Sequence, residues 1–239
     1  MIKNGKVPIF HIKDFEVVYP NSKKKIVYNV DFPIFQNEII LITGRSGSGK
    51  FTLFLVLKGI LSKIYNCRIS GKIYFENNNI IDNYPEFLDI KIGYLGQNPY
   101  SQIMNSIVID ELVFGMENYK YPKEIINKNI IKYSNIFKLE EKLEEKTKSL
   151  SGGLCQRLNL ASIISYEPPI LLLDEPVSFL DNNAIKIFYE ILKSFKGKKT
   201  IIIIEHNFKD ILPIVDKVMF FENDYEDLNY RSKIILSLM

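Results

Sequence analysis

The stretch Gly44-Arg45-Ser46-Gly47-Ser48-Gly49-Lys50-Phe51-Thr52 lies between two apolar runs, residues 39–43 and 53–57. A strand, a glycine-rich loop and a helix in this order are what a phosphate-binding loop (P-loop) requires. The glycines let the backbone curl until several N–H groups point at one anion, and the helix adds its free N–H groups and positive dipole end. Lys50 supplies a mobile charge for the β- and γ-phosphates. The sequence therefore predicts that residues 44–52 bind a nucleoside triphosphate.

One position of this loop departs from the expected pattern. After the lysine the pattern has Ser or Thr, whose hydroxyl coordinates Mg²⁺, and here the residue is Phe51. Thr52 follows, but one helical residue corresponds to about 100° of rotation, so its hydroxyl should not replace the missing one. We expect nucleotide binding to be retained but reduced, and hydrolysis at this loop to be impaired.

Composition points to an ordinary globular protein. The chain has 239 residues, of which 46% are hydrophobic and 25% charged, and its net charge is +3. This length allows one large domain or two small ones with a sizeable core. The small net charge gives no reason to expect a nucleic-acid partner.

The cysteines and the apolar runs limit the possible locations. Cys67 and Cys155 lack the spacing of a zinc site or a disulfide framework, which favours a reducing, intracellular location. No signal peptide is expected, since no long apolar stretch follows the N-terminus. No apolar run reaches the roughly 18 residues that a membrane span needs, so we expect any membrane role to depend on docking to another protein.

The hydrophobic pattern predicts an α/β fold. The predicted strands are 9–18, 26–35, 38–43, 71–75, 90–95, 170–173, 200–204 and 217–221. The predicted helices are 50–61, 182–195 and 207–214, together with a helical stretch over 105–146 and a helix that starts near Ser151. Turns are expected at residues 20–23 and 77–79. The continuous apolar strands separated by helices indicate a parallel sheet buried on both faces, with a helical subdomain inserted.

A second motif follows the apolar run Ile170–Leu173. Asp174 and Glu175 come directly after it, at the carboxyl edge where ligands bind in α/β sheets. Asp174 is predicted to hold Mg²⁺ through water, and Glu175 to polarise the attacking water as general base.

A third motif, Leu150-Ser151-Gly152-Gly153-Leu154, opens a predicted helix with a serine and two glycines. It predicts an anion site of the same kind as the loop at 44–52, although an ordinary serine N-cap is the simpler explanation. At this point the chain resembles the ABC-type ATPases, whose signature begins Leu-Ser-Gly-Gly-Gln. Leu154 stands where that glutamine is usual. The resemblance implies that Ser151, Gly152 and Gly153 contact phosphate.

The resemblance continues in the family's order along most of the chain. It implies that Gln97 is the Q-loop glutamine, which senses Mg²⁺ and water, and that His206 is the switch histidine, which contacts the γ-phosphate. It further implies that residues 178–181, ending in Asp181, form the D-loop, that Asp181 is one of the nucleotide-binding residues, and that Tyr19 stacks on adenine. The implied fold is a P-loop NTPase (RecA-like) core with an N-terminal antiparallel β subdomain and an inserted α-helical subdomain. The implied organisation is a single ABC ATPase domain, with 1–96 and 156–239 as core and about 97–155 as helical subdomain.

Within this family the pattern is similar to that of the energy-coupling factor ATPases. The similar segments are Gln97-Asn98-Pro99-Tyr100-Ser101-Gln102 and residues 109–118. The resemblance implies that ATP and Mg²⁺ are cofactors, that a transmembrane T component and a substrate-binding membrane subunit are partners, and that the chain lies at the cytoplasmic face of the membrane. It also implies a head-to-tail pair with a second ABC ATPase subunit, either as a homodimer or a heterodimer.

The function that the resemblance implies is an ATP-binding and ATP-hydrolysing subunit that powers uptake of a vitamin or a metal ion through separate membrane subunits. Two alternatives to this transport function remain open. The first is a hydrolysis-impaired nucleotide-binding subunit that regulates a partner in a heterodimeric ATPase. In such a pair, Ser151, Gly152 and Gly153 would complete the partner's site while the chain's own P-loop forms the weaker one. The second alternative is a soluble ABC protein without a transport role, which is less favoured because this single cassette carries neither a tandem copy nor a long coiled-coil insertion.

Overall fold

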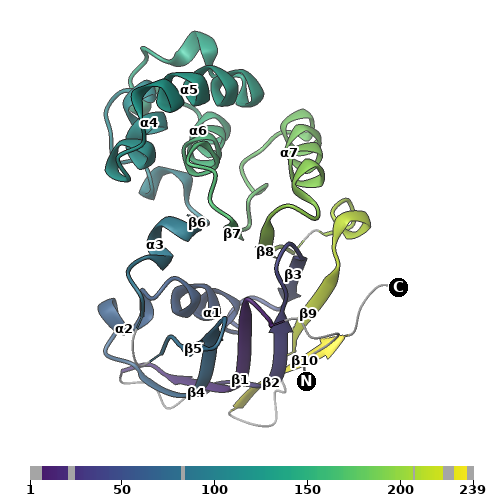
Figure 1. Cartoon of the computed structure of the whole chain (residues 1–239). Helices are drawn as coiled ribbons and strands as arrows, with labels where there is room; N and C mark the ends of the chain where they lie inside the picture. The colour runs from purple at the N-terminus through teal and green to yellow at the C-terminus, as the bar shows by residue number, and fades with distance from the viewer. Residues whose placement is uncertain (1–6, 21–24, 82–83, 207, 223–228, 236–239) are drawn as a thin grey trace. The chain divides into compact units, whose positions relative to one another are not determined.

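The computed structural model describes residues 7–20, 25–81, 84–206, 208–222 and 229–235. The chain divides into two compact units, Met1–Asp89 with Phe195–Met239, and Ile90–Ser194 (Figure 1). The prediction of a mixed α/β fold with an antiparallel β subdomain is confirmed by the strands described below. The predicted subdomain boundaries at about residues 97 and 155 stay a prediction.

Antiparallel strands make up one part of the first unit. β1 (Phe10–Val18) pairs with β2 (Lys25–Ile34) on one side and with β4 (Arg68–Phe75) on the other, and β5 (Asn78–Asn79) pairs with β4. Alternate residues of β1 are buried, as expected for a strand with one covered face. The register shifts after Lys13, where Asp14 has a φ of 41°. Gly71 lies opposite this bulge, and a Cβ there would be 2.2 Å from the Asp14 carbonyl oxygen, so this position requires glycine.

Parallel strands form the other part of the first unit. β3 (Ile39–Gly44) lies between β8 (Thr200–Ile204) and β9 (Lys217–Glu222) and is parallel to both. All five residues of β8 are buried, as the continuous apolar run predicted. β10 (Asn229–Ile235), which the hydrophobic pattern did not reveal, pairs with β9 and with β2 and thereby joins the parallel and antiparallel strands.

The helices of the first unit are shorter than predicted. α1 (Lys50–Leu57) was expected to reach residue 61, but Gly59 has a φ of 69°, and the chain resumes as the short α2 (Leu61–Ile64). The short α3 (Leu88–Lys91) follows at the end of this segment. The prediction of a helix over 207–214 is wrong: residues 208–211 are not helical and only a 3₁₀ turn, η5 (Leu212–Ile214), forms. Pro213 cannot continue an α-helix, because it lacks an N–H group and its ring clashes with the preceding turn.

Two predicted features lie wholly or partly outside the described residues. These are most of the turn at 20–23 and the first residue, 207, of the predicted helix. The predicted turn at 77–79 includes the two residues of β5.

The second unit consists of two parallel strands and four helices. β6 (Ile92–Leu95) pairs with β7 (Ile170–Asp174), and the helices are α4 (Val108–Asn118), α5 (Lys123–Phe137), α6 (Gly152–Ser165) and α7 (Asn182–Phe195). Three 3₁₀ turns complete it, η2 (Pro99–Ser101), η3 (Glu140–Lys142) and η4 (Thr147–Ser149). The predicted helical stretch 105–146 is thus two helices, separated at residues 119–122. Pro122 explains the break, since it can precede a helix but not lie within one.

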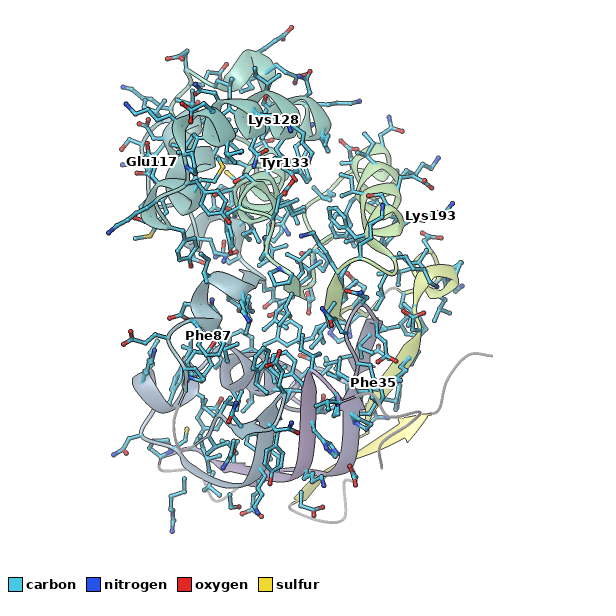
Figure 2. All side chains as sticks on the ribbon, viewed as in Figure 1. Phe35, Phe87, Glu117, Lys128, Tyr133 and Lys193 are labelled. Atoms are coloured by element: carbon cyan, nitrogen blue, oxygen red, sulfur yellow. The ribbon has the colours of Figure 1, made fainter. Side chains whose placement is uncertain are left out.

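Helices α4, α5 and α6 pack against one another within this unit (Figure 1). Tyr133 of α5 is buried, whereas Lys128 of α5 and Glu117 of α4 are exposed (Figure 2). The Asn129 side-chain amide donates to the Ser165 carbonyl at 2.7 Å and so ties α5 to the end of α6. Among the residues that the structure describes, no helix is both long and apolar enough to cross a lipid bilayer.

Candidate nucleotide-binding site

The glycine-rich loop connects β3 to α1, as the sequence predicted. Gly44, Gly47 and Gly49 all have positive φ angles, of 135°, 76° and 96°. Glycine adopts such angles without strain, and they let the loop turn back on itself. At Gly44 a Cβ atom would be 2.1 Å from the Phe221 carbonyl oxygen on β9, so no side chain fits there. Helix α1 has no side-chain cap and no acidic residue in its first turn, which leaves its first N–H groups suited to an anion.

Lys50 folds back over this loop. Its ammonium donates to the Gly44 carbonyl at 2.9 Å and to the Arg45 carbonyl at 2.7 Å, and its Nζ lies 3.4 Å from the Ser48 hydroxyl oxygen. Lys50 and Ser48 are both buried, whereas residues 45–47 are exposed. The loop therefore holds a positive charge at its centre and exposes its backbone at the rim, an arrangement suited to a phosphate chain.

Phe51 and Thr52 face different surroundings in the first turn of α1. The Phe51 side chain is 45% exposed, whereas Thr52 is only 4% exposed. The Thr52 hydroxyl hydrogen-bonds the Tyr19 hydroxyl at 3.0 Å. The Thr52 hydroxyl and the Phe51 side chain therefore point in different directions, as expected from the rotation between neighbouring helical residues.

Tyr19, the predicted adenine-stacking residue, follows directly after β1 and is partly buried. Burial raises the pKa of its hydroxyl above the ordinary value, the hydrogen bond to Thr52 acting in the opposite direction. The hydroxyl thus stays protonated at neutral pH. The structure thus places Tyr19 against α1, the helix that follows the P-loop, although Tyr19 and this helix are far apart in the sequence.

His206 lies beyond the end of β8, the parallel neighbour of β3. Its imidazole is exposed, and its backbone N–H donates to the carboxylate of the buried Glu205 at 2.9 Å. The Glu205 N–H donates to the Ile42 carbonyl on β3. His206 and the P-loop are thus carried by adjacent strands of one unit. Sequence reasoning gave Glu205 no role, and its position between an apolar strand and the histidine was the available signal.

The predicted carboxylates lie at the end of β7 in the second unit. Asp174 is buried at 5% exposure. The Glu175 carboxylate accepts a hydrogen bond from the Gln97 side-chain amide at 2.9 Å. The structure therefore brings Gln97, Asp174 and Glu175 together, and these are the three residues predicted to act on metal and water.

The backbone of Glu175 is in the left-handed region, with a φ of 47°. The N–H and hydroxyl of Ser178 both donate to the Glu175 carbonyl, at 3.2 and 2.8 Å. The buried Gln156 of α6 donates to the next carbonyl, that of Pro176, at 2.9 Å. This turn therefore fixes a strained residue at the position where chemistry is predicted.

Side chains that sequence reasoning left without a role hold the segment after Gln97. Gln102 accepts from the Gly96 N–H at 2.8 Å and donates to the Tyr94 carbonyl, so it closes the loop that carries Gln97. Asn98 caps η2 through the Tyr100 N–H, and Asn159 of α6 donates to the Pro99 carbonyl at 2.7 Å. The Gln-Asn-Pro-x-x-Gln pattern therefore has a structural basis as well as the family resemblance.

The signature segment begins α6 as predicted. Ser151 is its N-cap, and its hydroxyl accepts from the Leu154 N–H at 3.4 Å. Gly152 and Gly153 lie in a crowded place: a Cβ on Gly152 would be 3.0 Å from the Phe179 ring and 3.1 Å from the Tyr100 hydroxyl. At Gly153 it would be 3.0 Å from the Phe179 carbonyl. The signature segment and the predicted D-loop are therefore in contact.

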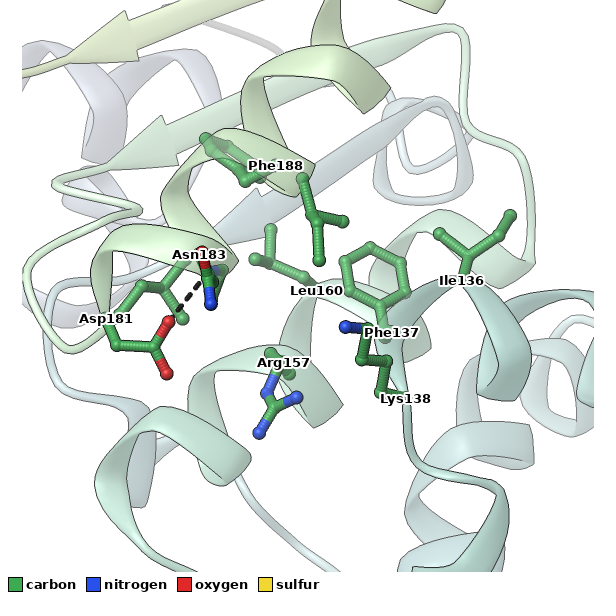
Figure 3. A pocket seen from close by; sticks show the side chains of 11 residues that line it. Ile136, Phe137, Lys138, Arg157, Leu160, Asp181, Asn183 and Phe188 are labelled. Atoms are coloured by element: carbon green, nitrogen blue, oxygen red, sulfur yellow. Dashed lines mark hydrogen bonds between the residues drawn. The ribbon is translucent and has the colours of Figure 1, made fainter.

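Asp181 caps the neighbouring helix α7. Its carboxylate accepts from the Ala184 N–H at 2.8 Å (Figure 3). It also borders a cavity of about 170 Å³, in which the side chains of Arg157 and Lys138 accompany an apolar wall. The residues that line the cavity are Ile136, Phe137, Lys138, Arg157, Leu160, Leu180, Asp181, Asn183, Ala184, Ile187 and Phe188. The nucleotide contact predicted for Asp181 stays a prediction.

The side chains at the end of β7, in the second unit, are better suited to bind Mg²⁺ than those of the P-loop, in the first unit. The Asp174 carboxylate is a hard oxygen ligand of the kind that Mg²⁺ prefers. Gln97 donates through its amide nitrogen to Glu175, which leaves its amide oxygen as the atom suited to a metal. In the P-loop, however, residue 51 offers a phenyl ring, and the hydroxyl of residue 52 is engaged by Tyr19.

Comparison with known proteins identifies the family. Residues 27–178, which include the P-loop, the Gln97 segment, the signature segment and both carboxylates, match the family model described as ABC transporter. The chain belongs to the ABC transporter family. The resemblance predicted from the motifs is therefore confirmed.

The similar relatives have consistent names. The chain is 31% identical over 212 residues to an ABC transporter ATP-binding protein of Saccharolobus solfataricus, covering 88% of this chain and 40% of that protein. It is 32% identical over 216 residues to one of Pyrococcus abyssi, covering 90% of this chain and 77% of that protein. The chain thus spans about two fifths of the length of several relatives, including the first of these.

A solved structure resembles this ABC family member over nearly its whole length. It is CbiO1 from Clostridium perfringens, described as part of the ABC transporter complex cbiONQ. The TM-score is 0.75 at 26% identity, and the match covers 96% of this chain and 88% of that one. The predicted fold class is confirmed by this match.

Proposed function

We propose that this chain is the ATP-binding and ATP-hydrolysing subunit of an energy-coupling factor type ABC transporter. It would power uptake of a vitamin or a metal ion through separate membrane subunits, from the cytoplasmic face of the membrane. The observation that carries the proposal is the hydrogen bond that Gln97 donates to Glu175, the residue directly after β7. The same chain also contains a P-loop. This bond orients a carboxylate at a sheet edge, as activation of a hydrolytic water requires.

Each residue then has a defined task. The loop backbone and Lys50 hold the β- and γ-phosphates, and His206 adds a donor to the γ-phosphate. Asp174 and Gln97 would hold Mg²⁺, which would supply positive charge when bound, and Glu175 would orient the attacking water. Such a site works by positioning and charge stabilisation more than by covalent chemistry. In a head-to-tail pair, Ser151, Gly152 and Gly153 would face the nucleotide on the partner's P-loop.

The proposed pair is unequal. The absence of a hydroxyl at residue 51 and the engagement of the Thr52 hydroxyl by Tyr19 both favour weak metal positioning at this chain's P-loop. The Phe51 backbone N–H is still able to donate to phosphate, so nucleotide binding would be retained. Retention of Glu175, Gln97 and His206 argues that hydrolysis is not lost altogether.

The weak metal positioning at this P-loop also supports a second candidate function, a subunit that binds ATP and stimulates its partner. ATPase activity of the chain alone and with its partner separates the two candidates.

Replacement of Lys50 by alanine tests the nucleotide site. We expect ATP affinity to fall about ten-fold or more, because a hydrogen-bonded charge contributes roughly 1.5–3 kcal/mol. Isothermal titration calorimetry on the purified chain measures this. The control is Lys72→Ala, since Lys72 is an exposed lysine on β4 far from the loop in sequence. Equal affinities of the two variants and the unmodified chain would exclude the loop as the ATP site.

A membrane partner is supported by large apolar side chains exposed in and near the Gln97 segment. They are Tyr100 on η2, Met104 in the following loop and Phe114 on α4. Exposed apolar side chains of this size favour a protein contact. We propose that residues 100–114, the docking segment, bind the transmembrane T component.

Met104→Asp tests the docking segment. Because Met104 is 73% exposed, the change should leave the fold intact, while a carboxylate would oppose burial in an apolar interface. We expect at least a ten-fold loss of T component in affinity purification of the assembled complex. Ile131→Asp on α5, where the side chain is 65% exposed, is the matched control and should retain the complex. Loss of the complex in both variants, or in neither, would contradict this assignment.

A further inference from the structure

The Tyr19 hydroxyl is tied to the P-loop helix. It hydrogen-bonds the Thr52 hydroxyl at 3.0 Å, across 33 positions of sequence. Thr52 is almost fully buried in the first helical turn after Lys50, so its hydroxyl is a stationary partner. The phenol end of Tyr19 is therefore anchored to the same turn that presents N–H groups to phosphate.

A second aromatic residue contacts the Tyr19 ring. The ring of Tyr65, which follows α2, lies edge-on to it, with centroids 5.7 Å apart and an interplanar angle of 79°. This is a favourable T-shaped geometry for two aromatic rings. Tyr19 thus has its hydroxyl held by Thr52 and its ring held by Tyr65, which together restrict the two side-chain torsions that otherwise leave a tyrosine free to turn.

We propose that the Thr52–Tyr19 hydrogen bond positions the ring that binds the nucleotide base, and that Thr52 serves base recognition instead of replacing the missing magnesium ligand. The inference rests on the proposed function, because it assigns a role within the same nucleotide site. A ring fixed in advance loses little conformational freedom when a base stacks on it, and the affinity for the base rises accordingly. Thr52 is a positioning residue in this proposal.

A double-mutant cycle tests the contact. Affinities for ATP and for tripolyphosphate, which has no base, are measured by calorimetry on the full chain and on Tyr19→Phe, Thr52→Val and the double variant. Tyr19→Phe keeps the stacking ring and removes only the hydroxyl. Each single variant should bind ATP about two- to ten-fold more weakly, the value of one hydrogen bond, and the double variant should be no weaker than the singles. Tripolyphosphate affinity should not change.

Two further variants separate positioning from general damage. Thr52→Ser keeps a hydroxyl and should restore ATP affinity. Tyr74→Phe on β4 removes a hydroxyl from a tyrosine whose ring lies near His11 instead, and should bind ATP as the unmodified chain does. Circular dichroism melting of each variant reports on the fold independently of nucleotide.

Three results would overturn the inference. In the first, Tyr19→Phe binds ATP as tightly as the unmodified chain, which leaves the nucleotide site intact but removes the role of the hydroxyl. In the second, Thr52→Val weakens tripolyphosphate as much as ATP, which makes Thr52 a phosphate ligand. In the third, the unmodified chain binds neither compound, and the proposed function then falls together with the inference.

Discussion

Ser151→Asp in this chain is expected to reduce ATP turnover of the pair formed with its partner ATPase by on the order of a hundred-fold or more. Aspartate is as good an N-cap as serine, so α6 should still begin at Gly152 with the cap to Leu154 retained. The new carboxylate, however, would stand where the proposal places the partner's γ-phosphate. Two like charges about 4 Å apart repel by roughly 4 kcal/mol at a protein surface of intermediate dielectric. Steady-state phosphate release by the purified pair measures the effect.

The neutral control for this prediction is Ser151→Asn. Asparagine has nearly the shape of aspartate and also caps helices, so turnover should fall far less.

A comparison with Lys50→Ala tests whether the two nucleotide sites of the pair are unequal. In an unequal pair, Ser151→Asp disables the strong site and Lys50→Ala only the weak one, so the first variant loses far more activity. Equal losses from both would indicate two equivalent sites, and full activity in Ser151→Asp would remove the signature segment from the proposed mechanism.

Phe51→Ser is expected to raise turnover of the pair and to lower the Mg²⁺ concentration needed for half-maximal activity. Serine returns a hydroxyl to the position after Lys50, where the phosphate-binding pattern supplies a metal ligand. Mutation of the residues that support metal ligands commonly alters metal affinity or activity by about ten- to a hundred-fold, and we expect a gain of the same order at this chain's own site. Titrations of ATPase activity with Mg²⁺ at fixed ATP measure it.

Phe51→Ala distinguishes the missing ligand from the bulk of the ring. Alanine removes the ring, 45% of which is exposed, but adds no oxygen. If the missing hydroxyl limits hydrolysis, Phe51→Ala should remain near the activity of the unmodified chain while Phe51→Ser rises. If both variants rise equally, the ring obstructs the site and the metal argument is wrong. If neither metal dependence nor turnover changes in Phe51→Ser, the unequal-site proposal fails.

Much of the fold was predictable because its signals are local. The apolar runs at β3, β7 and β8 predicted buried parallel strands, and the Ser-Gly-Gly sequence predicted the start of α6. Failures came where a local pattern was overruled. The expected helix over 207–214 was apolar enough, but Pro213 cannot extend a helix. β10 has no clear strand signal, and its existence depends on pairing with β9 and β2.

The sequence by itself determined the chemical groups of this protein: a glycine loop with Lys50, a buried strand that ends in Asp174 and Glu175, and a phenylalanine in place of a hydroxyl at residue 51. These follow from residue type and short spacing, which the chain order alone specifies. Only the tertiary structure decided how those groups are held. The bonds from Gln97 to Glu175 and from Tyr19 to Thr52 span 78 and 33 positions. Side-chain hydrogen bonds across such separations leave no periodic trace in a sequence, because they depend on how distant strands and helices pack.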